Sequence, residues 1–338
     1  MGLFFKNDNI LKIKHTPRCL ARFPSLGEGN TPLVELEQGL YAKLDYMMPT
    51  LSFKDRGAAV LMAAALEMGV KHVIQDSSGN AGCSIAAYAA RAGIKADIYI
   101  GDSTPPRKIK MIEDYGANVI IIKGTREDVA AAALKEVAKG EKFYASHVYN
   151  PLFAQGMKSY IFEVFEQMDG QLPDLVFVPL GNGTLFYGVY HGIKDLIRQG
   201  KVDKFPKIIA IQAAGCAPVY ESYNTWLNSK QENKKISPTP LLRPVINMGT
   251  VADGIAIANP ANGNDILKKI IEIDASVVAV TDLEIEQAYH TLALKGFHVE
   301  MTSAANYAGY KKYLSTEKFE SGSSTRPVNL ITLCGTSK

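Results

Sequence analysis

Cysteine is scarce in this chain of 338 residues, and the few cysteines form no pattern. Cys19, Cys83, Cys216 and Cys334 lie far apart, form no C-x-x-C pair and have no histidine at metal-ligand spacing. A disulfide framework and a zinc site are therefore not expected, and no metal is assigned. Scattered single cysteines are typical of a reducing compartment, so we expect a cytoplasmic protein.

Excess charge and long apolar runs are missing as well. The 37 Lys and Arg residues and 34 Asp and Glu residues leave a formal charge of only +3, without a dense basic run interleaved with aromatic residues. Nucleic acid is therefore not an expected partner. No apolar run is long enough to cross a bilayer, and residues 1–14 lack the apolar core of a signal peptide, so no membrane partner is expected.

The composition is that of a globular chain with room for two domains, 47% hydrophobic and 21% charged. Short apolar runs of strand length alternate with helical stretches. In the first half, strands are predicted at 40–44, 72–75, 96–100, 118–122 and 142–145, and helices at 54–69, 80–93, 105–115 and 126–139. In the second half, strands are predicted at 175–179, 208–212, 277–281 and 328–333, and helices at 152–168, 185–198, 217–228, 263–272, 283–295 and 303–314. This alternation predicts an α/β fold with two doubly wound parallel-sheet domains.

One lysine stands out at the start of a predicted helix. Lys54 lies in the sequence S-F-K-D-R-G (52–57), and the helix that follows is apolar nearly all round, which predicts burial. Cations are disfavoured at a helix N-terminus, and we expect the neighbouring Arg56 to disfavour the charged amine further. A neutral, nucleophilic amine is what a Schiff-base lysine needs. A solvated linker lysine is the alternative.

Two strand-to-helix turns carry polar or glycine-rich sequences, and ligands of open α/β sheets bind at such turns. The first, D-S-S-G-N-A-G (76–82), offers hydroxyls, an amide and free backbone N–H groups to an anion, or is merely a Ser/Asn N-cap. The second, P-L-G-N-G-T-L (179–185), allows several N–H groups to point at one phosphate. It is neither a P-loop nor a G-x-G-x-x-G fingerprint.

In order and wording, these segments resemble the fold type II pyridoxal-phosphate enzymes, the tryptophan synthase beta-like family, and most closely the threonine synthase-like members. The resemblance runs from Gly27 to about Gly335 and includes N-P at 150–151, C-A-P at 216–218, T-V-A-D-G-I at 250–255 and E-M-T-S-A at 300–304. It implies a cofactor, pyridoxal 5′-phosphate, in the cleft between the two domains. It also implies a homodimer.

The resemblance assigns the site residue by residue. Lys54 is the implied Schiff-base lysine, Asn80 the contact to the phenolic oxygen, and Cys334 the group facing the pyridine nitrogen. The implied phosphate-binding loop is Gly181, Asn182, Gly183, Thr184 and Leu185. The implied substrate-carboxylate loop is Ser77, Ser78, Gly79, Asn80 and Ala81. A large domain, residues 1–40 and 150–338, would bind the cofactor phosphate, and a small domain, residues 41–149, would carry the asparagine loop.

Cys334 also limits the expected reaction. A thiol does not keep the ring nitrogen protonated as a carboxylate does, which favours elimination or replacement at the side chain of a small amino acid over transamination. The freed Lys54 amine then serves as the general base. The resemblance implies a lyase of amino-acid biosynthesis that converts O-phosphohomoserine to threonine and phosphate. A serine/threonine dehydratase (ammonia-lyase), a cysteine synthase-like β-replacement enzyme and a non-catalytic cofactor carrier or regulator are the alternatives.

A clamp for the substrate phosphate is not evident. Relatives often carry an arginine shortly after Asn-Pro, whereas here L-F-A-Q (152–155) follows. Lys158, Ser159, Arg107 and Lys108 are candidates, but the favoured interpretation of each is a solvated helix residue.

Overall fold

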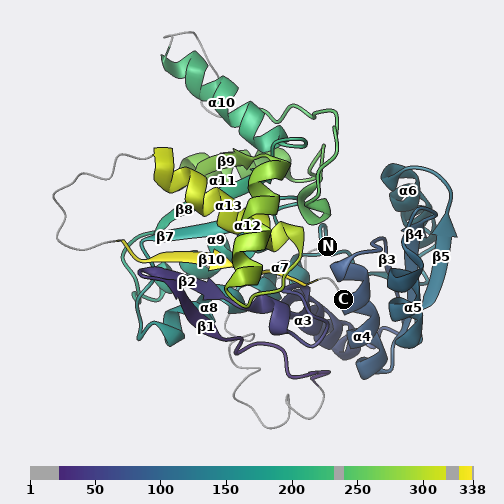
Figure 1. Cartoon of the computed structure of the whole chain (residues 1–338). Coiled ribbons are helices and arrows are strands. Elements are labelled where there is room, and N and C mark those ends of the chain that lie inside the picture. The colour runs from purple at the N-terminus through teal and green to yellow at the C-terminus, as the bar shows by residue number, and fades with distance from the viewer. Residues whose placement is uncertain (1–22, 232–239, 317–326, 337–338) are drawn as a thin grey trace. The chain divides into compact units, whose positions relative to one another are not determined.

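The computed structural model describes residues 23–231, 240–316 and 327–336, which form two compact units (Figure 1). The smaller unit contains residues 23–28 and Ala58–Ser146, and the larger contains Gly29–Gly57 and the described residues from His147 onward. The sequence places the start of the smaller domain at residue 41, whereas the structure groups residues 41–57 with the larger unit. The reason is that this segment forms strand pairs and ion pairs with residues of the larger unit. Residues 1–22 and the other gaps lie outside the described part.

A four-stranded parallel sheet forms the smaller unit, in the order β5-β4-β3-β6. The helices of this unit are α4, α5 and α6, together with α3 from Ala58 onward. The first residues of α3 belong to the larger unit. Helix α6 begins with a capping box in which Thr125 and Asp128 satisfy each other's backbone N–H groups. The elements are α3 (Lys54–Glu67), β3 (His72–Gln75), α4 (Asn80–Ala92), β4 (Lys95–Gly101), α5 (Pro106–Asp114), β5 (Asn118–Ile122), α6 (Arg126–Val137) and β6 (Phe143–Tyr144).

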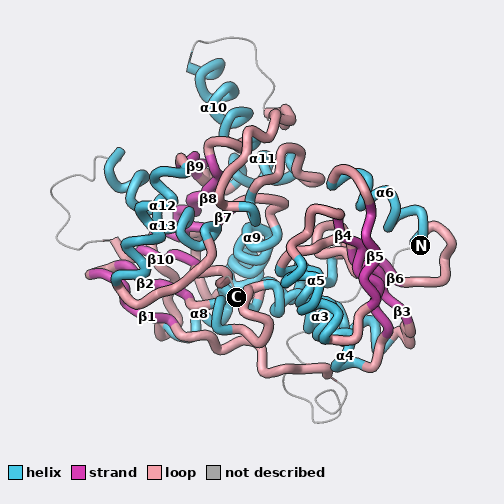
Figure 2. Tube along the Cα trace, turned by 45° about the vertical axis from the view of Figure 1, so that its right-hand side comes forward, coloured by secondary structure: helices cyan, strands magenta, loops and turns pink. Residues whose placement is uncertain are grey.

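The larger unit has a six-stranded sheet in the order β1-β2-β10-β7-β8-β9 (Figure 2). Strand β1 runs antiparallel to β2, and the remaining neighbours are parallel. The elements are β1 (Leu33–Glu37), β2 (Leu40–Lys43), η1 (Asp45–Met47), α7 (Pro151–Met157), α8 (Ser159–Gln167), β7 (Leu175–Pro179), α9 (Thr184–Arg198), β8 (Lys207–Ala213), α10 (Pro218–Gln231), η2 (Asp253–Ile255), α11 (Gly263–Glu272), β9 (Ser276–Val280), α12 (Asp282–Leu294), α13 (Met301–Thr316) and β10 (Asn329–Thr332).

Both faces of this sheet are covered. Phe177 of β7 packs edge-on against Tyr310 and Tyr313 of α13, with ring centroids 5.4 and 5.7 Å apart. Val176 and Val178 point to the other face, because successive strand residues alternate, and both are fully buried. Continuous burial along β7 is the pattern expected of a central parallel strand. No helix of the described part is long and apolar enough to cross a membrane.

Each sheet has a point where the strand order reverses. In the larger sheet, β7, β8 and β9 follow one another in one direction, and β10 returns to the other side of β7. In the smaller sheet, β6 returns to the other side of β3 in the same way. Ligands of doubly wound folds bind at the carboxyl ends of strands at such points. The turns after β7 and β10, and the turn after β3, are therefore the expected ligand sites of each unit.

The predicted helix 152–168 is two helices, α7 and α8, separated at Lys158. Helix α9 passes close to this break: a Cβ built on Gly188 would lie 2.6 Å from Cβ of Met157. The Lys158 ammonium donates to Asp195 of α9 at 2.7 Å. The apolar pattern gives no sign of this contact, since it continues across the break.

Candidate active site

Lys54 is the first residue of α3, as the sequence predicts. Its Nζ lies 3.2 Å from Oγ1 of Thr184, the first residue of α9. It also lies 4.5 Å from the centre of the Phe53 ring and 5.9 Å from that of Phe153. The larger unit therefore brings together two predicted site residues that are 130 positions apart in the chain.

The surroundings of Lys54 lower its pKa from the usual 10.5 to about 8. Burial is the main cause, since it disfavours the ammonium, while the electrostatic influence of Cys334 and the negative charge of Glu300 oppose it. The predicted direction is confirmed, but the predicted contribution of Arg56 is wrong. Arg56 is itself paired with carboxylates, so its charge is compensated locally.

The glycine turn after β7 leads directly into α9. Gly183 is the N-cap of α9 in the left-handed region, at φ 83°, and no side chain caps the helix. A Cβ on Gly181 would lie 3.0 Å from the carbonyl oxygen of Gly254, so the turn rests on η2. The first N–H groups of a helix have no partner within it, so this uncapped end offers donors to an anion.

Cys334 follows β10 and is fully buried. Its Sγ lies 3.3 Å from Oγ of Ser303 and 3.5 Å from Oε1 of Glu300. The Cys334 carbonyl accepts from the N–H of Phe53 at 2.9 Å, which joins the strand end to the Lys54 segment. The pKa of the thiol is well above its usual value, mainly through burial and then through the charge of Glu300.

A family model described as "Pyridoxal-phosphate dependent enzyme" matches residues 24–331 of the chain. The chain belongs to this family. The sequence-based predictions of the family, of the α/β fold and of pyridoxal phosphate as the cofactor are thereby confirmed. The protein is a pyridoxal-phosphate-dependent lyase, as predicted.

Curated relatives of this family member include two enzymes called threonine synthase. The one from Methanocaldococcus jannaschii is 37% identical over 87% of this chain and 72% of its own length. The one from Methanosarcina acetivorans is 34% identical over 85% of this chain and 70% of its own length. Among solved structures, processed threonine deaminase isoform 2 from Solanum lycopersicum has a TM-score of 0.75 at 22% identity, covering 98% of this chain and 89% of that one.

The predicted carboxylate loop of this pyridoxal-phosphate enzyme lies in the smaller unit, at the carboxyl end of β3. Asn80 is the first residue of α4, and the N-cap is Gly79 without a side-chain cap. The simple Ser/Asn N-cap is therefore not what the structure shows. Oγ of Ser77 instead accepts from the N–H of Gly79 at 3.4 Å, and a Cβ on Gly82 would lie 1.8 Å from the Ser77 carbonyl oxygen. Gly82 thus permits the loop to fold tightly onto its own helix.

Arg56, two residues after Lys54, is the centre of a buried ionic network in the larger unit. Its guanidinium binds Asp45 through two donors at 2.8 Å each and Glu163 through two donors at 2.7 and 2.9 Å. Lys43 also pairs with Glu163 at 3.0 Å. Two cations and two carboxylates balance, which makes such deep burial tolerable. The network fixes the first turn of α3 relative to η1 and α8.

The four candidate phosphate-binding residues differ in burial and in their partners. Lys158 is not solvated but buried, and it pairs with Asp195. Ser159 accepts from Arg56 at 3.0 Å. Arg107 is exposed on α5, in the smaller unit, and Lys108 beside it is half-buried. Lys158 and Ser159, the two candidates in the larger unit, therefore already have partners that hold the start of α8 in place.

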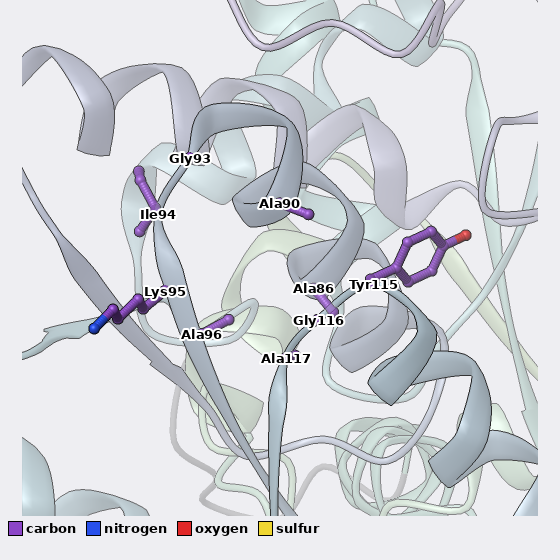
Figure 3. A pocket seen from close by; sticks show the side chains of 9 residues that line it. All are labelled: Ala86, Ala90, Gly93, Ile94, Lys95, Ala96, Tyr115, Gly116 and Ala117. Carbon is purple, nitrogen blue, oxygen red and sulfur yellow. The ribbon is translucent and has the colours of Figure 1, made fainter.

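A cavity of about 180 Å³ in the smaller unit is unrelated to these residues (Figure 3). It is lined by small or apolar side chains, and Lys95 and Tyr115 are its longest members. None of its lining residues belongs to the predicted site. It lies beside the C-terminal end of α4, whereas Asn80 begins that helix.

Proposed function

We propose that Lys54 holds pyridoxal 5′-phosphate as a Schiff base and that the glycine turn binds the cofactor phosphate. The contact of 3.2 Å between Lys54 Nζ and Thr184 Oγ1 carries this proposal, because it brings the nucleophile to the start of the uncapped helix α9. The phosphate is bound by the backbone of Gly181, Asn182, Gly183, Thr184 and Leu185. Cys334 faces the ring nitrogen.

The residues present fit such a group. An uncapped helix start preceded by glycine suits a phosphate, since the N–H groups and the helix dipole both favour an anion. A lysine with a pKa of about 8 is neutral often enough at neutral pH to attack a carbonyl carbon. The smaller unit would add Asn80 for the phenolic oxygen. We assign the cofactor phosphate to the larger unit and the asparagine loop to the smaller one.

The proposed reaction converts O-phosphohomoserine and water to threonine and phosphate, as the names of the curated relatives suggest. When bound, the cofactor withdraws electrons from the carbon that carries the amino group. The chain would supply the proton transfers: Nζ of Lys54 would accept the proton of that carbon and later return one. The substrate carboxylate is bound by Ser77, Ser78, Gly79, Asn80 and Ala81.

A dehydratase is the second candidate, and one observation favours it. Lys158 and Ser159, the two candidate phosphate-binding residues of the larger unit, are bound to Asp195 and Arg56. A substrate without a phosphate would need no further cation there.

One experiment separates the two candidates. Purified protein is incubated with O-phosphohomoserine, serine and threonine in turn, and phosphate, ammonia and keto acid are measured. Phosphate and threonine from O-phosphohomoserine support the proposal. Ammonia and keto acid from serine or threonine alone would contradict it and establish the dehydratase.

We further propose a cytoplasmic homodimer. Cys83, Cys216 and Cys334 are buried and form no disulfide with one another, which suits a reducing compartment. Sedimentation of the purified protein tests the dimer: a mass of one chain at micromolar concentration would contradict it.

A further inference from the structure

The ladder between β7 and β10, the two strands at the reversal point of the larger sheet, ends early. Among the described residues, these strands pair at only two positions, Asn329↔Leu175 and Leu330↔Val176. The N–H of Leu333 donates to β2 at 3.0 Å, so the carbonyl of Thr332 points the opposite way, toward β7. A continued parallel ladder would direct this carbonyl at the nitrogen of Pro179, which carries no hydrogen. The ladder therefore cannot bond this carbonyl at the strand ends.

The side chain of Asn306, on α13, supplies a bond to each strand instead. Its Nδ2 donates to the Thr332 carbonyl of β10 at 3.2 Å and to the Phe177 carbonyl of β7 at 3.0 Å. An amide nitrogen has two hydrogens, so one is available for each carbonyl. Asn306 is fully buried, and its Oδ1 has no hydrogen-bond partner among the described residues. A buried polar group that is only partly satisfied calls for an explanation beyond packing.

Each of the two strand ends carries one half of the contact between Lys54 and Thr184. The end of β10 holds the Lys54 segment, because the Cys334 carbonyl accepts from the N–H of Phe53 at 2.9 Å. The end of β7 leads through the glycine turn to Thr184, the first residue of α9. The distance of 3.2 Å between Lys54 Nζ and Thr184 Oγ1 therefore depends on how the two strand ends are held relative to each other.

We propose that Asn306 is a positioning residue that holds the end of β10 against the end of β7 and thereby sets the spacing between Lys54 and the glycine turn. The inference rests on the proposed function, in which these two groups bind opposite parts of one cofactor. A cofactor fixed by its phosphate presents its aldehyde carbon to the amine only at the correct spacing, since the reacting atoms must come within about 3–3.5 Å. A loosened strand end should therefore impair imine formation more than phosphate binding.

Asn329 offers a matched control, because its amide makes the same kind of bridge elsewhere. It is buried, its Nδ2 donates to the carbonyls of Gly39 at 3.2 Å and Pro327 at 2.9 Å, and its Oδ1 also lacks a partner among the described residues. It is the first residue of β10, at the end of the strand opposite to the site. Asn306→Ala and Asn329→Ala therefore remove the same pair of bonds, but only Asn306→Ala removes them at the site.

The first test uses the full chain without cofactor and measures amide hydrogen exchange by mass spectrometry. In Asn306→Ala, the amides of residues 180–185 and 333–336 should exchange about tenfold faster than in the wild type, because the strand ends open more easily. Asn329→Ala should leave both segments unchanged. Asn306→Leu also removes both donors but fills the space, so it serves where Asn306→Ala does not fold. Wild-type exchange of both segments in a folded Asn306 variant overturns the proposal.

The second test compares two forms of the cofactor on the same proteins. Pyridoxine 5′-phosphate lacks the aldehyde and reports phosphate binding alone, whereas pyridoxal 5′-phosphate also reports the imine with Lys54. In Asn306→Ala, the affinity for the aldehyde form should fall about tenfold more than the affinity for the alcohol form. Equal losses for the two forms, or the same difference in Asn329→Ala, overturn the proposal.

The two tests also separate this inference from the proposed function. If borohydride labelling of the wild type does not map to Lys54, or if the wild type does not bind pyridoxine 5′-phosphate, the proposed function fails. The hydrogen exchange of the cofactor-free chain still decides whether Asn306 holds the two strand ends together.

Discussion

Lys54 differs from a surface lysine because its burial lowers its pKa. A neighbouring cation is not the cause. Reduction of the holoenzyme with borohydride should fix the cofactor on Lys54, which a mass-spectrometric peptide map checks. Lys54→Ala should abolish turnover and leave the fold intact, because alanine is the best helix former. Lys268→Ala, an exposed change on α11, is the control and should retain full activity. A reduced adduct on another lysine would disprove the assignment.

The pKa of Lys54 predicts the pH dependence of cofactor capture. Because the folded chain holds this pKa at about 8 instead of 10.5, the neutral amine becomes the main form above pH 8. The rate at which cofactor-free protein forms the imine should therefore rise with pH and level off near 8 to 9. Stopped-flow absorbance measures this rate. A rate that keeps rising toward pH 10.5 would mean that Lys54 is solvated in solution.

The sequence revealed those site residues whose chemistry is carried by a local motif. Lys54 and the glycine turn lie in continuous strings, and the structure brings Lys54 and Thr184 within 3.2 Å. Asn306 was not assigned a role, because the two carbonyls that it joins, those of Phe177 and Thr332, belong to strands far apart in the sequence. A buried contact between distant segments leaves no periodic trace in either one.

Helix α9 has a glycine with a positive φ close to each of its two ends. Gly183 precedes α9 at φ 83°, and Gly200 follows it at φ 67° with open space around its would-be Cβ. Alanine is strained at both positions, by about 1–2 kcal/mol. Only Gly183→Ala should also weaken cofactor binding strongly, because its Cβ would displace Ile266 and distort the anion-binding turn. Equal cofactor affinity of the two variants, measured by fluorescence titration, would show that the phosphate is bound elsewhere.

The Arg56 network makes a prediction about stability. Arg56→Met leaves Asp45 and Glu163 buried with less compensation and should cost about 3–5 kcal/mol in urea unfolding. The control is Arg198→Met, which removes an exposed arginine that pairs with Asp195 and should cost about 1 kcal/mol or less. A loss as small as that of the control would mean that the network is dispensable.

The network also predicts a pH dependence. Arg56 and Lys43 hold the pKa of Glu163 at about 2, below its usual 4.5, against the opposing effect of burial. A depressed carboxyl pKa stabilises the fold above pH 4.5, and this contribution disappears as the pH falls toward 2. Arg56→Met should therefore lose less stability between pH 5 and pH 3 than the wild type does. Parallel curves for the two proteins would contradict this coupling.

Secondary structure was predictable where burial is continuous and the ends are marked by turn residues. The bounds of β3, β5 and β7 agree with the prediction to the residue. Strand β1 was not predicted, because it is a short edge strand whose residues are only partly buried, so its apolar pattern is weak. The break between α7 and α8 depends on the close approach of α9, which the local sequence does not record.

For the molecule as a whole, the alternation of strands and helices was enough to predict two α/β units, but not their strand order. The place of β10 between β2 and β7 depends on pairing between segments nearly 300 residues apart. That place is what brings Cys334 and the glycine turn to the same reversal point of the sheet. The site of the larger unit therefore follows from topology, and the motifs alone specify only its parts.

The two units should serve one reaction, with the substrate carboxylate bound by the smaller unit. Ser78→Ala removes a hydroxyl from the loop after β3, so it should raise KM for the amino-acid substrate about tenfold and leave cofactor affinity unchanged. An amine that lacks the carboxylate should bind wild type and variant equally well, which cofactor absorbance measures. Ser103→Ala, an exposed serine after β4 in the same unit, is the control and should change neither value. If Ser78→Ala weakens binding of the amine as much as that of the amino acid, the loop does not recognise the carboxylate, and the smaller unit contributes to the fold alone.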